Sequence, residues 1–223
     1  MKYIVTGGSG FIGSNLVEEL LKNNHEVLNI DIKAPNIGSH LPNWKKRNVL
    51  DKKKLIADFA DFKPTHIIHL AARTDTLSNE LEDYKSNTDG TENVLAAIKK
   101  TDSIERVIIT STQFVNQYNG VPKNDLDFHP HTAYGVSKVI NEKSTRSVDL
   151  ECIWTIIRPT NIWGPWHPRY PYEFWRILGK GIYIHPGKKV VKRSYGYVKN
   201  VIFQIINICE ALPNRVNGKV YYV

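Results

Sequence analysis

The stretch TGGSGFIG, residues 6–13, decides the fold of this chain of 223 residues. It follows a short run of strand-forming residues (KYIVT, residues 2–6) and opens a segment with apolar residues at helical spacing (FIGSNLVEELLK, residues 11–22). Its glycines fit the pattern G-x-G-x-x-G, in which Gly10 lets a pyrophosphate approach the backbone and Gly13 lets the helix pack closely on the strand. The helix N-terminus offers unpaired N–H groups to the phosphates. We therefore predict a dinucleotide-binding loop here.

Strand and helix patterns alternate along the chain as far as about residue 157. This alternation predicts an α/β fold, a doubly wound parallel sheet with helices on both faces. Further strands are expected at residues 26–30, 65–70, 106–110 and 152–157, and further helices at residues 55–62, 93–100 and 133–146.

The pattern changes after Pro159, where the sequence becomes rich in Trp, Pro and Gly. We expect residues 1–159 to form the dinucleotide-binding domain and residues 160–223 to form a small substrate-binding lobe, either truncated or reduced. Within this lobe the patterns predict short helices and strands at residues 172–178, 182–185, 202–212 and 219–223.

Composition limits the classes of protein that this chain can belong to. With 41% hydrophobic and 23% charged residues it is neither a disordered polar chain nor a disulfide-dense mini-protein. Lys and Arg exceed Asp and Glu by 30 to 22, and the net charge of +8 suits an anionic ligand such as a nucleotide, or RNA. We interpret Cys152 and Cys209 as reduced cysteines of a cytoplasmic protein, and we expect no signal peptide, membrane span or metal site.

Asp31 ends the second predicted strand. An acid at this point accepts hydrogen bonds from the adenosine ribose and repels a 2′-phosphate, which favours NAD over NADP. Lys33, close by, leaves the choice between the two cofactors open, and the alternative is that Asp31 only caps a turn.

Tyr134 and Lys138 lie four residues apart on a predicted helix, and this spacing places them on one helix face. A cation beside a phenol lowers its pKa from about 10, so the pair could take a proton from an alcohol while hydride moves to a nicotinamide. A hydroxyl is expected at the end of an earlier strand, where Thr110, Ser111 and Thr112 follow one another. The alternative is that these hydroxyls are turn residues.

Together these residues resemble the extended short-chain dehydrogenase/reductase family, in its NAD-dependent sugar epimerase/dehydratase branch. The resemblance covers nearly the whole chain and implies a Rossmann-like fold with NAD as cofactor. The matching stretches are residues 6–13, Asp31, His69–Ala72 (HLAA), Asn87 with Gly90 and Thr91, residues 110–112, residues 134–138 and residues 158–165 (RPTNIWGP).

The resemblance also implies roles for single residues. Thr112 takes the position of the catalytic hydroxyl, with Ser111 as the alternative, next to the catalytic pair Tyr134 and Lys138. Substrate contacts are implied for Asn161, Arg193 and Thr112, and Asn87 corresponds to a structural asparagine behind the site. The residues expected at the cofactor are Gly7, Gly10, Phe11, Ile12, Gly13, Asp31, Ile32, Asn48, Val49, Leu70, Ala71, Ala72, Tyr134, Lys138, Pro159 and Asn161.

Three features depart from the family pattern. Asn48 replaces an acid that reads adenine, although an amide can still form a hydrogen bond to the base. Gln113 and Phe114 stand where dehydratases carry an acid pair, and neither can shuttle a proton, which argues against a 4,6-dehydratase. The chain is also shorter than such enzymes commonly are.

We therefore expect an NAD-dependent nucleotide-sugar epimerase, similar to the 4-epimerases, that acts by transient hydride transfer. The resemblance also implies a homodimer formed through the helix that carries Tyr134 and the helix before it. A nucleotide-sugar reductase or dehydrogenase of the same family is the nearest alternative. A non-catalytic nucleotide- or RNA-binding protein on the same fold is a third, but such a protein has no need of Tyr134 and Lys138, so we do not expect a nucleic-acid partner.

Overall fold

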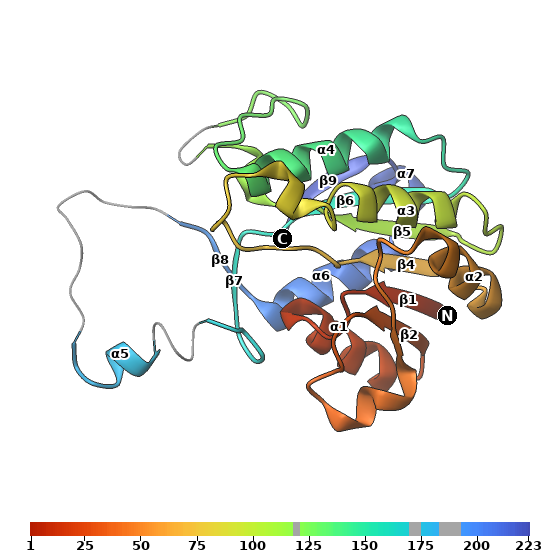
Figure 1. The fold of residues 1–223 in the computed structure, drawn as a ribbon, viewed down its shortest axis with the longest axis horizontal. Helices are drawn as coiled ribbons and strands as arrows, with labels where there is room; N and C mark the ends of the chain where they lie inside the picture. The colour runs from red at the N-terminus through yellow and green to blue at the C-terminus, as the bar shows by residue number, and fades with distance from the viewer. Residues whose placement is uncertain (118–120, 170–174, 183–192) are drawn as a thin grey trace.

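Seven parallel strands form the central sheet of the protein, in the order β3-β2-β1-β4-β5-β6-β9 (Figure 1). The computed structural model describes residues 1–117, 121–169, 175–182 and 193–223. The sheet confirms the predicted α/β class. Its strands are β1 (Lys2–Thr6), β2 (Glu26–Asp31), β3 (Trp44–Lys46), β4 (His66–His69), β5 (Arg106–Thr110), β6 (Ile153–Arg158) and β9 (Lys219–Tyr222), and β7 (Asn161–Trp163) pairs with β8 (Tyr195–Tyr197) in a separate parallel ribbon.

Helices cover both faces of this sheet (Figure 1). Alternate residues of each strand point to opposite faces, so Tyr3 and Val5 pack in one buried apolar cluster while Ile4 packs in another. The first cluster includes residues of α1 (Phe11–Lys22) and α6 (Val198–Glu210), and the second includes residues of α2 (Lys52–Phe62) and α3 (Asp89–Ile98). The remaining helices are α4 (Ala133–Ser147), which contacts α3, and the short α5 (Arg176–Leu178) and α7 (Pro213–Val216).

The strand order reverses between β1 and β4, and this reversal places the site. The chain runs from β1 outward to β2 and β3, and then returns to the other side of β1 to form β4. In open parallel sheets a ligand binds outside the carboxyl ends of the strands at such a switch point. The Thr6 hydroxyl and Nδ1 of His69, at the ends of β1 and β4, are hydrogen-bonded at 2.6 Å. The TGGSGFIG loop begins directly at this edge.

Much of the chain after Pro159 is built into the main sheet. β9 pairs with β6 in parallel register from Thr155 and Lys219 onward, and α6 packs against α1. The helix α5 lies away from the sheet (Figure 1), whereas Ile162 of β7 packs in the first apolar cluster. We predicted a substrate-binding lobe over residues 160–223, and within that range the structure places α6 against the main sheet and β9 in it.

Two of the predicted elements in this region can be compared only in part. The helix expected near residues 172–178 is described as α5 from Arg176, and the strand expected at residues 182–185 lies outside the described residues except for Ile182. None of the helices in the described part of the chain has the length and apolar character that a membrane crossing requires.

Candidate active site

The glycine loop between β1 and α1 is tightly folded. Gly7 has a φ of +73°, and its N–H donates to the carbonyl of Ile30 at 2.8 Å. A Cβ on Gly13 would collide with the Gly7 carbonyl oxygen, so only glycine lets α1 begin so close to the loop. Gly10 is exposed, and among the other residues a Cβ there would meet only the Gly7 oxygen, at 3.2 Å. The loop therefore leaves open backbone where a pyrophosphate is expected.

Asn29 supports this loop from β2, a role that sequence reasoning missed. Its side-chain N–H donates to the Ser9 hydroxyl at 3.0 Å, and a Cβ on Gly8 would overlap the Asn29 side chain. Asn29 is wholly buried between the apolar residues Leu28 and Ile30, and a polar residue at such a position was the signal available in the sequence.

Asp31 reaches the glycine loop from the end of β2. One carboxylate oxygen accepts the N–H of Ser9 at 3.0 Å, and the other accepts the N–H of Lys33 at 2.9 Å. The carboxylate thus caps a turn and also joins the dinucleotide loop, so the two interpretations of Asp31 are compatible. Ile32 follows it with its side chain 55% exposed, open to a ligand at this edge.

Asn48 and Val49 occupy different environments on the same segment. Asn48 is exposed, and its amide oxygen accepts the N–H of Leu50 at 3.0 Å. Val49 is buried in the core, where Gly90 leaves room for it, and its carbonyl accepts from Asn93 at 3.1 Å. The side chain of Val49, predicted to contact the cofactor, is therefore packed in the core and not open to a ligand.

The HLAA stretch continues from β4 alongside the glycine loop. The N–H of Leu70 donates to the Thr6 carbonyl at 2.9 Å, and a Cβ on Gly7 would lie 2.6 Å from the Ala71 nitrogen. Leu70, Ala71 and Ala72 are half-buried at this edge. They therefore border the same opening as Gly7.

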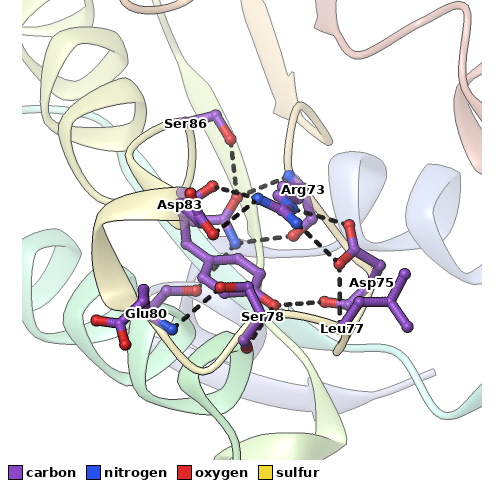
Figure 2. Close-up of polar contacts among 10 residues, drawn as sticks. Arg73, Asp75, Leu77, Ser78, Glu80, Asp83 and Ser86 are labelled. Carbon is purple, nitrogen blue, oxygen red and sulfur yellow. Dashed lines mark hydrogen bonds and ion pairs between the residues drawn. The ribbon is translucent and has the colours of Figure 1, made fainter.

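A polar cluster holds the loop that follows, residues 73–86 (Figure 2). The Arg73 guanidinium donates to the Asp75 carboxylate at 2.9 Å and to the Asp83 carbonyl at 3.2 Å, and it lies over the Tyr84 ring. The Tyr84 hydroxyl donates to the carbonyl of Asp75 at 2.9 Å. This cluster orders a loop whose inner ring, Tyr84, lies 6.1 Å from the ring of Tyr134.

Asn87 connects this loop to α4. Its side-chain oxygen accepts the Arg73 N–H at 2.8 Å, and its side-chain nitrogen donates to the Arg73 carbonyl at 3.0 Å and to the Ser137 hydroxyl at 2.9 Å. Since Asn87 is fully buried just before α3, its amide serves the structure rather than a ligand.

Tyr134 begins α4 beside the end of β5. Thr132 caps the helix through a 3.0 Å hydrogen bond from the N–H of Gly135. Tyr134 is 7% exposed, and the Thr112 side chain is near enough to its phenol to oppose the rise in its pKa. The phenol and the predicted catalytic hydroxyl are therefore together.

Ser111 faces away from this pair. Its hydroxyl donates to the Glu142 carboxylate at 2.6 Å, inside the protein. Thr112 is extended, with φ −161° and ψ 157°, and successive side chains of an extended chain point to opposite sides. In this structure the Ser111 hydroxyl is therefore engaged with Glu142 and not directed to Tyr134.

Lys138 lies one helical turn after Tyr134 and is 2% exposed. Its ammonium donates to the Thr110 carbonyl at 2.8 Å. Burial lowers the pKa of Lys138 to about 8, and the charge of Glu142 partly offsets that effect.

The pKa of Tyr134 corrects an expectation from the sequence. We expected Lys138 to lower it, but burial raises the pKa of Tyr134 to about 12, against the opposing effect of the Thr112 side chain. The physical reason is that the phenol is removed from water while the ammonium is engaged with the Thr110 carbonyl. In this state the phenol holds its proton.

The segment after β6 brings further predicted residues to the same edge. Pro159 is buried, and its carbonyl accepts the Gln113 N–H at 3.1 Å. The Asn161 side chain donates to the Ser194 carbonyl at 3.1 Å, which joins it to the residue after Arg193. The ribbon of β7 and β8 thus brings the two predicted substrate contacts, Asn161 and Arg193, near each other in space.

Residues 165–167 return to the start of α1, which no sequence signal indicated. The Asn15 side chain donates to the Pro165 carbonyl at 3.0 Å. The ring of His167 lies 4.8 Å from that of Phe11, edge to face. Phe11 therefore packs under this segment rather than standing open to a ligand. As for metals, no group of three or more His, Cys, Asp or Glu side chains in the described residues could hold an ion.

These features fit a bound dinucleotide. The loop at Gly10 has backbone without a side chain where phosphates approach, and Asp31 carries a carboxylate at the end of β2 for a ribose.

The fold and site define a dinucleotide-binding protein of the short-chain dehydrogenase/reductase type. The sequence profile of the NAD dependent epimerase/dehydratase family matches residues 3–223, and the chain belongs to this family. The match confirms the resemblance and the expectation of NAD as cofactor.

Individual proteins that are similar to the chain carry different activities. A UDP-glucose 4-epimerase of Mycolicibacterium smegmatis is 30% identical over 187 residues, 74% of this chain and 57% of that protein. A 3-beta-hydroxysteroid dehydrogenase of Mycolicibacterium neoaurum is 27% identical over 100% of this chain and 65% of its own length. The crystal structure of a Thermus thermophilus UDP-glucose 4-epimerase in complex with NAD is 26% identical, with a TM-score of 0.78 over 100% of this chain and 77% of that one. The chain spans 57% of the length of the M. smegmatis epimerase and 65% of that of the M. neoaurum dehydrogenase, less than two thirds in both cases.

Proposed function

We propose that this protein is an NAD-dependent nucleotide-sugar 4-epimerase that acts by transient hydride transfer. The observation that carries the proposal is that Lys138, one turn after Tyr134 on α4, donates to the Thr110 carbonyl at 2.8 Å, because this places the phenol and its cation beside Thr112 at the carboxyl end of β5. Lys138 lies one turn along the same helix, and the glycine loop lies at the neighbouring strand end.

Tyr134, Thr112 and Lys138 have different roles in the proposed proton transfer. NAD, when bound, supplies the acceptor and donor of hydride. Tyr134 exchanges a proton with the sugar hydroxyl, and Thr112 holds the same oxygen in line with the phenol. Because the phenol keeps its proton in the present arrangement, Tyr134 acts as a base only when positive charge is brought near it, and the buried Lys138 is the side chain that can contribute that charge.

The loop after Thr112 favours epimerisation over dehydration. Loss of water from the sugar needs a further acid and base, and Gln113 and Phe114 occupy the positions where the dehydratases carry them. The Phe114 ring lies 6.0 Å from the Tyr134 ring, so an apolar group borders the reacting oxygen.

A nucleoside diphosphate sugar suits the charge of the protein. The net charge is +8, and Arg193 lies beside the Asn161 ribbon at the edge of the site. The UDP-glucose 4-epimerases among the similar proteins make UDP-glucose the first substrate to test.

A dehydrogenase with net turnover of cofactor is the second candidate, because one similar protein is a 3-beta-hydroxysteroid dehydrogenase. The test incubates the chain with NAD and UDP-glucose and follows the sugar by proton NMR and NADH by its absorbance. An epimerase forms the C4 epimer with no net NADH. A dehydrogenase accumulates NADH in proportion to product, and that outcome would overturn the proposal.

A further inference from the structure

The carboxylate of Glu142 joins three elements behind the site. It lies on α4 two turns after Tyr134 and one turn after Lys138, on the same helix face, and it is fully buried. It accepts the Ser111 hydroxyl at 2.6 Å, and it pairs with Arg158 through Nε at 2.8 Å and Nη2 at 2.9 Å.

Glu142 therefore contacts the ends of two strands. Ser111 follows β5 and directly precedes Thr112, while Arg158 ends β6 and directly precedes Pro159. Arg158 continues outward, donating to the Asp125 carbonyl at 2.7 Å and to the Tyr222 hydroxyl at 3.0 Å. A buried ion pair is a costly way to join elements when apolar packing would serve, which points to a use beyond stability.

We propose that Glu142 is a positioning residue of the active site: its carboxylate fixes Thr112 toward Tyr134 by anchoring Ser111, and its charge holds Lys138 as an ammonium ion. The inference rests on the proposed function, since it assigns a role within the same proton transfer. The carboxylate of Glu142 bonds Ser111 and Arg158 and touches no reacting atom itself.

The first part of the argument is geometric. Because the chain is extended at Thr112, the direction of the Ser111 side chain fixes the direction of its neighbour. The anchored Ser111 also donates its backbone N–H to the Ile157 carbonyl at 2.7 Å, so it is held from two sides. Without Glu142, the Ser111 hydroxyl loses its acceptor and Thr112 loses this restraint.

The second part is electrostatic. In the described residues, the charged or titratable groups that act on Lys138 are Glu142 on its own helix and His69 on β4. Burial lowers the pKa of His69 to about 3, so the ring is neutral at physiological pH and leaves Glu142 as the charge that favours the ammonium. The other cations at Glu142 are Arg158, already paired, and Arg146, whose Nη2 lies 3.8 Å from the carboxylate.

The test is a titration of the lysine side chains by NMR on the full chain with labelled lysine. Lys138 is assigned as the signal that disappears in Lys138→Arg. In Glu142→Gln we expect the Lys138 midpoint to fall by about one pH unit, since an opposite charge is removed from its surroundings. Ser111→Ala and Glu92→Gln, an exposed glutamate on α3, leave the midpoint unchanged.

Measuring kcat as a function of pH separates the geometric part of the proposal from the electrostatic part. Ser111→Ala lowers kcat about tenfold without moving the pH profile, because it releases Thr112 but keeps the charge. Glu142→Gln lowers kcat and also shifts the profile toward lower pH. If Glu142 only stabilises the fold, Ser111→Ala and Glu142→Gln either unfold or keep the wild-type kcat, and their pH profiles do not differ.

The outcomes are distinguishable from failure of the proposed function. If the titration midpoint of Lys138 shifts in Glu142→Gln but the wild-type chain has no epimerase activity, the effect of Glu142 on Lys138 is supported and the proposed function is overturned. If Glu142→Gln does not fold, Glu142→Asp keeps the charge but draws it back by one methylene, and the midpoint falls by a smaller amount. An unchanged Lys138 midpoint in a folded Glu142 variant overturns the proposal.

Discussion

The backbone N–H of Ser9 donates a 3.0 Å hydrogen bond to the carboxylate of Asp31. This contact joins the glycine loop of the first crossover to the end of the second strand. The acid that is expected to meet the ribose is therefore held by the same loop that is expected to meet the phosphates. A substitution of Asp31 should therefore change both the affinity for the cofactor and the preference between NADH and NADPH.

Replacing Asp31 by Ala should weaken NADH binding about tenfold, the loss of one hydrogen bond to a charged group. The variant should also lose its preference for NADH over NADPH, since no carboxylate then repels the 2′-phosphate. Fluorescence titration of both nucleotides measures the two effects. Asp102→Ala, which removes a charge from the exposed turn before β5, is the control, and equal losses in the two variants would contradict this role of Asp31.

Gly10→Ala should leave the protein folded and weaken NADH binding at least tenfold. The added methyl group meets only the Gly7 oxygen within the protein, at 3.2 Å, but it enters the space expected for the pyrophosphate. Gly38→Ala is a matched control, because a Cβ there meets nothing within 4 Å. Calorimetric binding and thermal unfolding separate affinity from stability. Wild-type affinity in Gly10→Ala would place the phosphates elsewhere.

Tyr134→Phe should lower the epimerisation rate by about 10²-fold or more and leave NADH affinity within twofold, as is usual for removal of a general acid–base group. Its ring packing is kept, so the midpoint of thermal unfolding should barely change. Tyr195→Phe, with a ring 61% exposed, serves as the control for the loss of a phenol. A Tyr134→Phe protein that still turns over at the wild-type rate would exclude the proposed proton carrier.

Acid should destabilise the fold through its buried histidines. Burial lowers the pKa of His66 to about 4 and that of His69 to about 3, whereas both rings protonate near pH 6.5 in the unfolded chain. The unfolded state then binds more protons below pH 6.5, so stability is lost as the pH falls from there and the loss levels off below each folded-state pKa. Between pH 7 and pH 5 each histidine should cost about 2 kcal/mol.

Urea unfolding at the two pH values measures this loss. His66→Gln should reduce the pH dependence by about half while His69 remains. An equal drop in the variant and the wild type would show that other groups govern the acid response.

The sequence predicted the strands of the sheet except β3 (Trp44–Lys46), because the signals of the others are local. The TGGSGFIG loop and the period of the apolar residues mark β1, α1 and the later βα units within a few residues of their ends. The partner of β9 could not be predicted in this way, since its pairing with β6 joins residues more than sixty positions apart. The same limit applies to α6, which was expected from its pattern but not placed against α1.

For the proposed site, the sequence indicates which residue types take part but not where their side chains point. The spacing of Tyr134 and Lys138 gave the pair, but the bond from Lys138 to the Thr110 carbonyl depends on how α4 lies on β5. The choice between Ser111 and Thr112 likewise depends on Glu142, one turn beyond Lys138. Tyr134, Lys138 and Glu142 follow one another at intervals of four residues, and this spacing was the signal available in the sequence for Glu142.

The measurement that tests the central claim most directly follows hydrogen at the sugar carbon. The chain is incubated with NAD and UDP-glucose deuterated at C4, and the product is examined by NMR and mass spectrometry. Transient hydride transfer predicts a C4 epimer that keeps its deuterium at C4, because the same label leaves and returns. Tyr134→Phe should form this epimer about 10²-fold more slowly, or slower still. An epimer whose C4 carries hydrogen from water, or the appearance of label in free NADH with no epimer, would contradict the account.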